Sequence, residues 1–247
     1  MDISVKFGDY SFKKTVNSWD TDVRSKLNTD GRALVDGVSL GNTFLNGREI
    51  SIQGVLIKST ETALRTAFDE LKAALNLGKK YLYFFDDRRI LAAVDRFSWE
   101  DYPRSYKNPA RCEYNIEFKA ESPYWESTSE TSDEETVVVI AGEYTWTINN
   151  PGSVNVYPTI TIEDASLNCV LQNNTDIPTG EAQGLKFALS TTGKFIVDCV
   201  EGTVEVGDVN YIRYFAGAFL KLLPGDNSIT YTGEDCTITT VFRQRYL

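Results

Sequence analysis

Apolar and polar residues alternate with period two in several segments of the first half of the chain, as in half-buried β-strands. Residues 3–7 (ISVKF) alternate in this way up to a Gly-Asp turn. Segment 46–57 (NGREISIQGVLI) begins with an Asn-Gly turn, and its apolar positions change register at Gly54, which predicts a β-bulge there. Strict alternation over 112–120 predicts a further half-buried strand.

One segment has the helical period instead and predicts a helix over about 60–77. Its apolar residues recur at intervals of three and four and form one stripe: Leu64, Phe68, Leu71 and Leu75. Ser59 or Thr60 can cap the first turn, where Glu61 also favours the helix dipole. Gly78 stands where a helix end favours a left-handed residue.

After the helix, YLYFF and RILAAVDRFSW flank Asp86 and Asp87, which predicts a hairpin. The first half therefore combines several strands with one helix.

The second half predicts only short strands separated by turns, and no segment of it has the helical period. About ten short strands with frequent turns are typical of a two-sheet sandwich. The predicted strands are 136–140, 143–149, 157–163, 168–173, 184–189, 194–199, 203–206, 218–223, 227–231 and 236–243.

Composition divides the chain into the same two parts. Residues 121–135 read ESPYWESTSETSDEE, a polar and acidic stretch that predicts an extended connection. We therefore predict an N-terminal domain over 1–125, a linker over 126–136 and a sandwich over 137–247. Residues 1–125 carry 19 basic and 18 acidic side chains, whereas 126–247 carry 6 and 17. Binding of nucleic acid or of an anionic membrane by the acidic half is disfavoured, because its contacts with phosphate groups would be repulsive.

The chain of 247 residues contains no histidine, which excludes catalytic triads and metal sites that depend on imidazole. Its four cysteines, Cys112, Cys169, Cys199 and Cys236, lack the paired spacing of a zinc site, and buried reduced thiols are the favoured interpretation over a disulfide. The N-terminal residues lack the apolar stretch of a secretion signal, and no apolar run is long enough to span a bilayer. We expect synthesis in a reducing cytoplasm, and neither a metal nor a cofactor.

Four short motifs could carry chemistry, but each has a simpler structural interpretation. Asp86-Asp87 could be a carboxylate pair, yet neighbouring residues of a strand point to opposite faces, and Asp is common in turns. The run 133–135 (DEE) could bind a cation but is typical of a solvated segment. Segment 224–227 (PGDN) could be a cation loop, although a hairpin turn is favoured. Asn173-Asn174-Thr175 fits the glycosylation pattern, which requires secretion.

Exposed aromatic residues in the second half could bind sugar by stacking, with core packing as the alternative. Tyr211, Tyr214 and Phe215 (YIRYF) are the strongest candidates, because aromatic residues crowd a predicted loop or edge there. We predict these three residues as a contact site for sugar or for a partner protein.

The order of these segments resembles the distal tail protein family of phages with long non-contractile tails, over the whole chain. The first half contributes NGREISIQGVLI, the single helix, DDRRILAAV and RCEYNIEFKAESPYW. The second half contributes NPGSVNVYPTITIE and LLPGDNSITYTG, followed by a last strand. Each motif is structural; the order of the set carries the resemblance.

The resemblance implies a structural virion protein at the tail tip. The N-terminal domain would form a homohexameric ring around a channel through which DNA passes, and isolated rings could pair back to back. The ring would join the tail tube and tape-measure proteins to tail-tip, baseplate and receptor-binding proteins. The C-terminal sandwich would be similar to galectins and carbohydrate-binding modules, and no membrane binding is implied. Strand edges could join the subunits, and residues 2–7 and 46–57 are the candidates.

Two further functions compete with the structural hub. A carbohydrate-binding module for host attachment would depend on the sandwich alone. A carboxylate-dependent hydrolase would need two positioned carboxylates, and no convincing pair is present. The charge of the first half does not distinguish a basic channel lining from an ordinary surface. We therefore expect a structural protein and not an enzyme.

Overall fold

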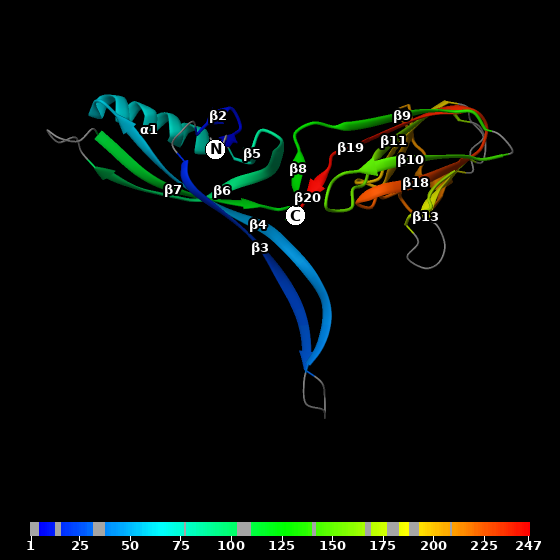
Figure 1. The fold of residues 1–247 in the computed structure, drawn as a ribbon, viewed down its shortest axis with the longest axis horizontal. Helices are drawn as coiled ribbons and strands as arrows, with labels where there is room; N and C mark the ends of the chain where they lie inside the picture. Colours follow the sequence, from blue (N-terminus) through cyan, green and yellow to red (C-terminus); the bar gives the residue numbers. More distant parts are fainter. Residues whose placement is uncertain are drawn as a thin grey trace. The chain divides into compact units, whose positions relative to one another are not determined.

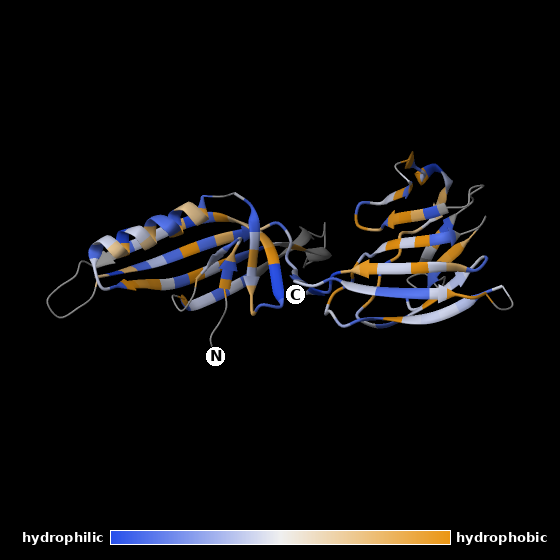
Figure 2. Cartoon of the chain, turned by 90° about the horizontal axis from the view of Figure 1, so that it is seen from above, coloured by the Kyte–Doolittle hydropathy of each residue, from blue (hydrophilic) through white to orange (hydrophobic). Residues whose placement is uncertain are grey.

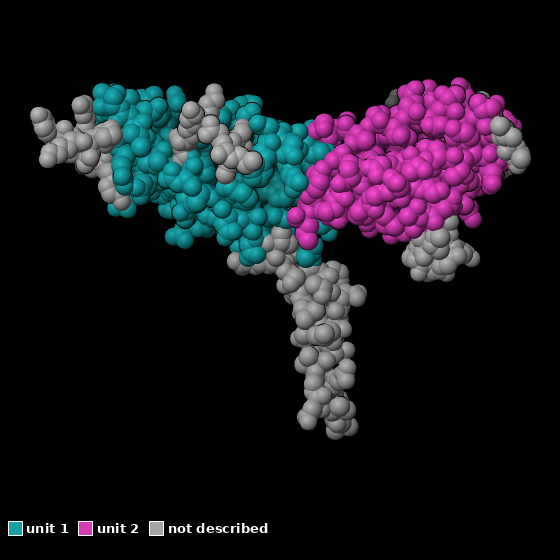
Figure 3. Space-filling model, in the orientation of Figure 1, with its two compact units in different colours: residues 1–128 teal, residues 129–247 magenta. Residues whose placement is uncertain are grey.

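The computed structural model describes the chain in two compact units, residues 1–128 and 129–247 (Figure 3). The described residues are 5–12, 16–31, 38–76, 78–102, 110–139, 142–165, 169–176, 183–187, 193–207 and 209–247, without the side chains of 23–31, 38–44, 46, 101, 102, 165, 183, 187 and 193. Ile3 of the first predicted strand lies outside this description.

Unit 1 is a curved antiparallel sheet with one helix packed on it (Figure 1). Its elements are β1 (Val5–Phe7), β2 (Tyr10–Ser11), β3 (Val16–Gly31), β4 (Val38–Lys58), α1 (Glu61–Leu75), β5 (Lys80–Phe84), β6 (Arg88–Tyr102), β7 (Ala110–Ala120) and β8 (Trp125–Ser127). The strands follow the order β2-β1-β5-β6-β7-β4-β3, and β8 pairs with β6.

The predicted helix is confirmed, together with its cap and its apolar stripe. The Thr60 hydroxyl accepts a hydrogen bond from the backbone N–H of Ala63 (3.2 Å). Leu64, Phe68, Leu71 and Leu75 are all buried against the sheet. Gly78 has a φ of +72°, which a glycine adopts without strain.

Strand β4 corrects two expectations about segment 46–57. It keeps one register with β7 from Arg48 to Lys58, so no bulge interrupts β4 at Gly54. Gly54 and Leu56 continue the buried face instead, whereas Val55 and Ile57 lie on the other face. The irregularity lies opposite, in β3, where the pairing shifts between Val16 and Ser18.

The free edge of this sheet is also not where the sequence suggested. Strand β4 lies between β3 and β7, and β1 lies between β2 and β5, so neither is an open edge within the described chain. The sheet order ends instead in the two-residue strand β2 and in the long strand β3. The alternation of apolar and polar residues shows which face of a strand is buried, but not which strands lie on either side of it. Alternation alone therefore cannot distinguish an edge strand from a central strand.

Aromatic side chains fill the concave side of the sheet. Phe7 contacts Phe118 with ring centroids 5.0 Å apart, and Phe84 contacts Trp125 at 5.2 Å. Phe84 on β5 also contacts Trp19 on β3, although three strands separate them in the sheet order. The sheet therefore curls until distant strands share one core. Figure 2 shows the alternation of hydrophobic and hydrophilic residues along the strands that makes this core possible.

Unit 2 is a sandwich of two antiparallel sheets, as predicted. One sheet has the order β10-β18-β12-β13-β17 and the other β16-β15-β14-β11-β19-β9. The elements are β9 (Thr131–Val137), β10 (Tyr144–Asn150), β11 (Thr159–Ala165), β12 (Val170–Asn173), β13 (Gln183–Phe187), β14 (Gly193–Asp198), β15 (Thr203–Val206), β16 (Val209–Asn210), η1 (Ile212–Tyr214), β17 (Phe215–Gly217), β18 (Gly225–Thr232), β19 (Cys236–Phe242) and β20 (Arg245–Tyr246).

Most of the segment predicted as a linker is paired strand. Strand β8 pairs with β6 in unit 1, and β9 pairs with β19 along its whole length in unit 2. The boundary between the units follows Thr128, inside the predicted segment 126–136. Acidic composition predicts an extended connection here, but the segment is extended as a strand at a sheet edge, where charged side chains can stay in solvent.

One further strand prediction and one turn prediction are corrected. Residues 218–223 form no strand, and only an isolated bridge joins Leu222 to Val156. Segment 224–227 is not a hairpin turn, because β18 already begins at Gly225 and Asn227 is fully buried within it.

All four thiols are buried, and none of them forms a disulfide. Burial raises the pKa of Cys169 to about 11 and that of Cys199 to about 12.

Candidate functional site

A two-stranded ribbon leaves the sheet of unit 1 (Figure 1). Strand β4 pairs with β7 only as far as Arg48, opposite Ala120. Beyond that point the described backbone of 25–31 pairs only with that of 38–45. Two strands alone are marginally stable in water. The ribbon is therefore a candidate contact element for another chain.

Glycine and arginine fix the base of this ribbon. A Cβ at Gly47 would lie 2.1 Å from the carbonyl oxygen of Ala120, so only glycine fits. The buried Arg48 guanidinium donates to the Pro123 carbonyl (Nε, 2.9 Å) and to the Thr21 hydroxyl (Nη1, 3.2 Å). Burial lowers the pKa of Arg48, against the opposing effect of Asp22. These contacts hold β3, β4 and the segment before β8 together.

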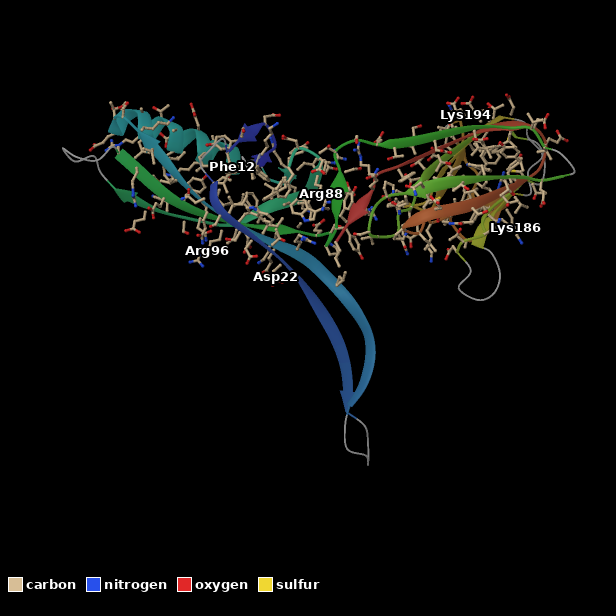
Figure 4. All side chains as sticks on the ribbon, in the orientation of Figure 1. Phe12, Asp22, Arg88, Arg96, Lys186 and Lys194 are labelled. Carbon is tan, nitrogen blue, oxygen red and sulfur yellow. The ribbon has the colours of Figure 1, made fainter. Side chains whose placement is uncertain are left out.

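The face of the sheet opposite its aromatic core is polar and acidic. Figure 4 shows Asp22 and Arg96 on the side away from α1. A hollow of about 470 Å³ on this face is lined by five carboxylates, Asp20, Asp22, Glu49, Asp95 and Glu117, together with Lys119. Lys119 binds Asp95 at 2.9 Å. This face gives no support to a basic channel lining.

A second hollow, of about 400 Å³, lies over β5, β6 and β7 and has an apolar floor. Tyr81, Leu91 and Tyr124 are among its lining residues. The Arg89 guanidinium lies 4.0 Å from the centre of the Tyr81 ring and 3.9 Å from a carboxylate oxygen of Glu126. Lys79 pairs with Glu121, Lys119 with Asp95 and Glu126 with the neighbouring Arg89, so the charges that line this hollow are paired within the unit.

The acidic motifs do not converge on a reaction centre. Asp86 and Asp87 lie in the turn between β5 and β6, and their partners are Lys6 (4.0 Å) and Arg88 (3.9 Å). The run 133–135 lies in β9. Within the part of the chain that the structure describes, no group of three or more Cys, Asp or Glu residues could hold a metal ion.

Asparagine side chains form a buried network at one end of the sandwich that the sequence analysis missed. Asn150, Asn173 and Asn227 are each at most 1% exposed. Asn173 donates to the Asn227 side-chain oxygen (2.9 Å), and Asn150 donates to the carbonyl of Val154 (3.1 Å). The motifs NPG, NNT and PGDN suggested turns or glycosylation; only burial distinguishes a network, and no sequence pattern reports it. Asn173 is too buried to accept a glycan.

The three predicted aromatic residues do come together. The Tyr211 and Tyr214 rings lie 5.5 Å apart, and Phe215 stacks on Phe219 at 4.6 Å. The Arg213 guanidinium lies 4.6 Å above the Tyr214 ring. All three are half-buried and pack against the core of the sandwich. Their ring faces are engaged inside unit 2, which disfavours stacking of a sugar, and a role in binding stays a prediction.

We expect Tyr214→Ala to lower the free energy of unfolding of unit 2 by about 1–3 kcal/mol, because the substitution removes a half-buried ring that packs at the margin of the core. Urea titration followed by hydrogen exchange of unit 2 peptides measures this. If Tyr214 binds sugar instead, the wild type should bind to a glycan array. Tyr214→Ala should then abolish this binding without changing the free energy of unfolding.

Acidic and aromatic side chains meet where β9 and β10 border the sandwich. The Tyr144 hydroxyl donates to Glu135, and this hydrogen bond raises the pKa of Tyr144. Burial raises the pKa of Asp133. The interaction with the Trp146 indole opposes this shift, and the charge of Glu135 adds to it. Inward-facing carboxylates of this kind discourage pairing at the edge of β9, the strand that carries them.

Comparison with known proteins finds relatives among phage tails. Residues 151–246 match the family model described as the siphovirus-type tail component, C-terminal domain. No curated protein matches the chain. In the described residues, no helix is both long and apolar enough to cross a bilayer.

The crystal structure of the SPP1 Dit (gp 19.1) protein, described as a paradigm of the hub adsorption apparatus in phages infecting Gram-positive bacteria, is similar over 100% of both chains, with 15% identity and a TM-score of 0.74. The phage P2 baseplate in its activated conformation with Ca matches over 98% of both chains, with 9% identity and a TM-score of 0.47, which is too weak to carry an argument. The resemblance to the distal tail proteins of siphophages is thus confirmed, for residues 151–246 by the family model and for the fold of the whole chain by the likeness to Dit.

Proposed function

We propose that this protein is a structural hub at the distal end of a phage tail, and not an enzyme. The likeness to the Dit fold over the whole length of both chains carries the proposal. The family match of residues 151–246 also supports it. In this role the protein joins the tail tube and tape-measure proteins to tail-tip, baseplate and receptor-binding proteins, and belongs to the virion.

We further propose that unit 1 assembles as a homohexameric ring, through which DNA passes. A ring needs heterologous contacts, in which one surface meets a different surface of the next copy. The ribbon formed by 25–31 and 38–45 and the open edge of β3 over 16–24 are two such surfaces. Both offer unpaired strand backbone that a neighbouring chain can complete.

We expect the purified chain to have a mass of about 166 kDa by light scattering, six times the 27.7 kDa of one copy, and to form rings in negative-stain images. Twice that mass would indicate two rings back to back. Replacing residues 26–44 by Asn-Gly joins Ser25 to its partner Leu45 through a two-residue turn. This variant is expected to stay monomeric, because it has lost the ribbon.

The matched control replaces only 32–37 by Asn-Gly and keeps the ribbon strands. It should form rings. Unchanged melting of the shortened variant would show that unit 1 still folds. A wild-type chain that is monomeric at every concentration, or rings formed by the shortened variant, would contradict the ring contact proposed here.

The sandwich could instead act as a carbohydrate-binding module for host attachment. The engaged ring faces of Tyr211, Tyr214 and Phe215 give this alternative no specific support. A contact with a partner protein fits them better, since protein side chains can pack on ring edges.

A further inference from the structure

The end strands of the two sheets in unit 2 differ in how they are protected. Strand β9 carries Asp133, Glu134 and Glu135 in succession. Strands β16 and β17 are only two and three residues long. Charges and short length both prevent strand pairing at an edge.

Strand β10 has neither form of protection. It is seven residues long, reads YTWTINN, and contains no charge, proline or glycine. It pairs with β18 along its whole length, and no strand of the described chain pairs with its other side. Uncharged segments of this length and β-propensity readily accept a further strand.

The register shows which backbone groups of β10 face outward. The N–H of Asn174 donates to the carbonyl of Ser228 (2.8 Å), so Ser228 directs its backbone groups toward the β12 side. Backbone groups of successive residues in a strand point to opposite sides, so Ile229 directs its N–H and C=O toward β10. Ile229 pairs with Trp146, whose backbone groups therefore point toward β18. It follows that Thr145, Thr147 and Asn149 present their N–H and C=O groups to the open side.

Several carboxylates lie near this edge, and their negative charge favours positively charged binding partners. Glu143 precedes β10, Glu135 holds Tyr144, and Asp226 accepts a hydrogen bond from the Asn149 side chain (2.7 Å). Residues 126–247 carry 17 acidic and 6 basic side chains. Pairing of β10 with a second copy would bring two such acidic units together, so charge disfavours a self-pair and favours a basic partner.

We propose that the open edge of β10 binds an extended segment of another protein, which adds to the sheet as a further strand and carries lysine or arginine near its ends. Backbone hydrogen bonds to Thr145, Thr147 and Asn149 provide affinity, and the carboxylates select the charge. This binding site is separate from the ring contacts in unit 1, and the inference does not depend on the hub function.

The full chain is mixed with a synthetic peptide of alternating valine and threonine flanked by lysines, and amide hydrogen exchange is followed by NMR. We expect exchange at Thr145, Thr147 and Asn149 to slow at least tenfold at saturation, and binding to weaken with added salt. A peptide flanked by glutamates should bind at least tenfold more weakly.

Thr147→Pro removes one outward N–H without breaking a bond to β18, and an edge strand tolerates proline there. It should weaken binding at least tenfold, whereas the matched Thr147→Val, which keeps the N–H, should bind as the wild type does. If Thr147→Pro melts below the wild type, Thr145→Pro serves the same purpose, compared with Thr145→Val because both lose the hydroxyl bond to Thr230. Absence of slowed exchange with the basic peptide, equal binding by the proline variants, or self-pairing of β10 without peptide would overturn the proposal.

Discussion

Phe118→Ala is expected to lower the free energy of unfolding of unit 1 by about 3–5 kcal/mol, the range for truncating a buried phenylalanine. Phe118 is 1% exposed on β7, the strand between β6 and β4. Its ring lies 5.0 Å from that of Phe7, and its backbone pairs with Ile50. The truncation leaves a cavity where the curved sheet closes, so few neighbours can move in to fill it.

Hydrogen exchange of β4 and β7 peptides in increasing urea measures this loss within the full chain. Glu117→Ala is the matched control, since residue 117 lies on the opposite face of the same strand. Its expected effect is about 0.5 kcal/mol or less. Equal effects of the two substitutions would contradict the packing described for unit 1.

Asn227→Ala is expected to destabilise unit 2 by about 2–4 kcal/mol, because it leaves several buried backbone groups without partners. The Asn227 amide nitrogen donates to the carbonyls of Leu223 (2.8 Å) and Gly225 (2.9 Å). Its oxygen accepts from the Leu223 N–H (2.8 Å) and from the Asn173 side chain (2.9 Å). The substitution removes these four bonds and a longer one to the Ile148 carbonyl (3.4 Å), all made by a side chain that is fully buried.

Asn227→Asp is a useful companion, because it preserves the shape but cannot donate to the two carbonyls. It should be at least as destabilising as alanine. The exposed Asn149→Ala should change the free energy by about 0.5 kcal/mol or less. Wild-type exchange at β12 and β18 in Asn227→Ala would show that the network does not hold this end of the sandwich.

Periodicity predicted the parts of the fold that depend on one face being buried. The helix at 61–75 follows from four apolar residues on one stripe and a threonine cap. The strand at 110–120 follows from strict alternation. These signals are local, because each residue reports its own exposure.

The errors concern relations between segments that lie far apart in the sequence. Alternation could not reveal that β4 is central and β3 is the edge, or that Gly54 occupies a buried position. The acidic composition of 133–135 predicts a linker, whereas the observed strand depends on pairing with β19, about a hundred residues later. The asparagine network was missed for the same reason.

The aromatic site shows the same division. Crowding of Tyr211, Tyr214 and Phe215 was visible in the sequence, but the covering of their faces by Arg213 and Phe219 was not. Sequence proximity identified the cluster, and only packing indicates what kind of partner it could accept.

The distribution of the four thiols makes each unit chemically distinguishable. Cys112 lies in unit 1 and the other three lie in unit 2, all of them buried. A thiol reagent therefore reacts at Cys112 only when unit 1 opens, and at the other sites only when unit 2 opens. Labelling followed by mass spectrometry then times the opening of each unit separately, in the unmodified chain and within an assembled particle.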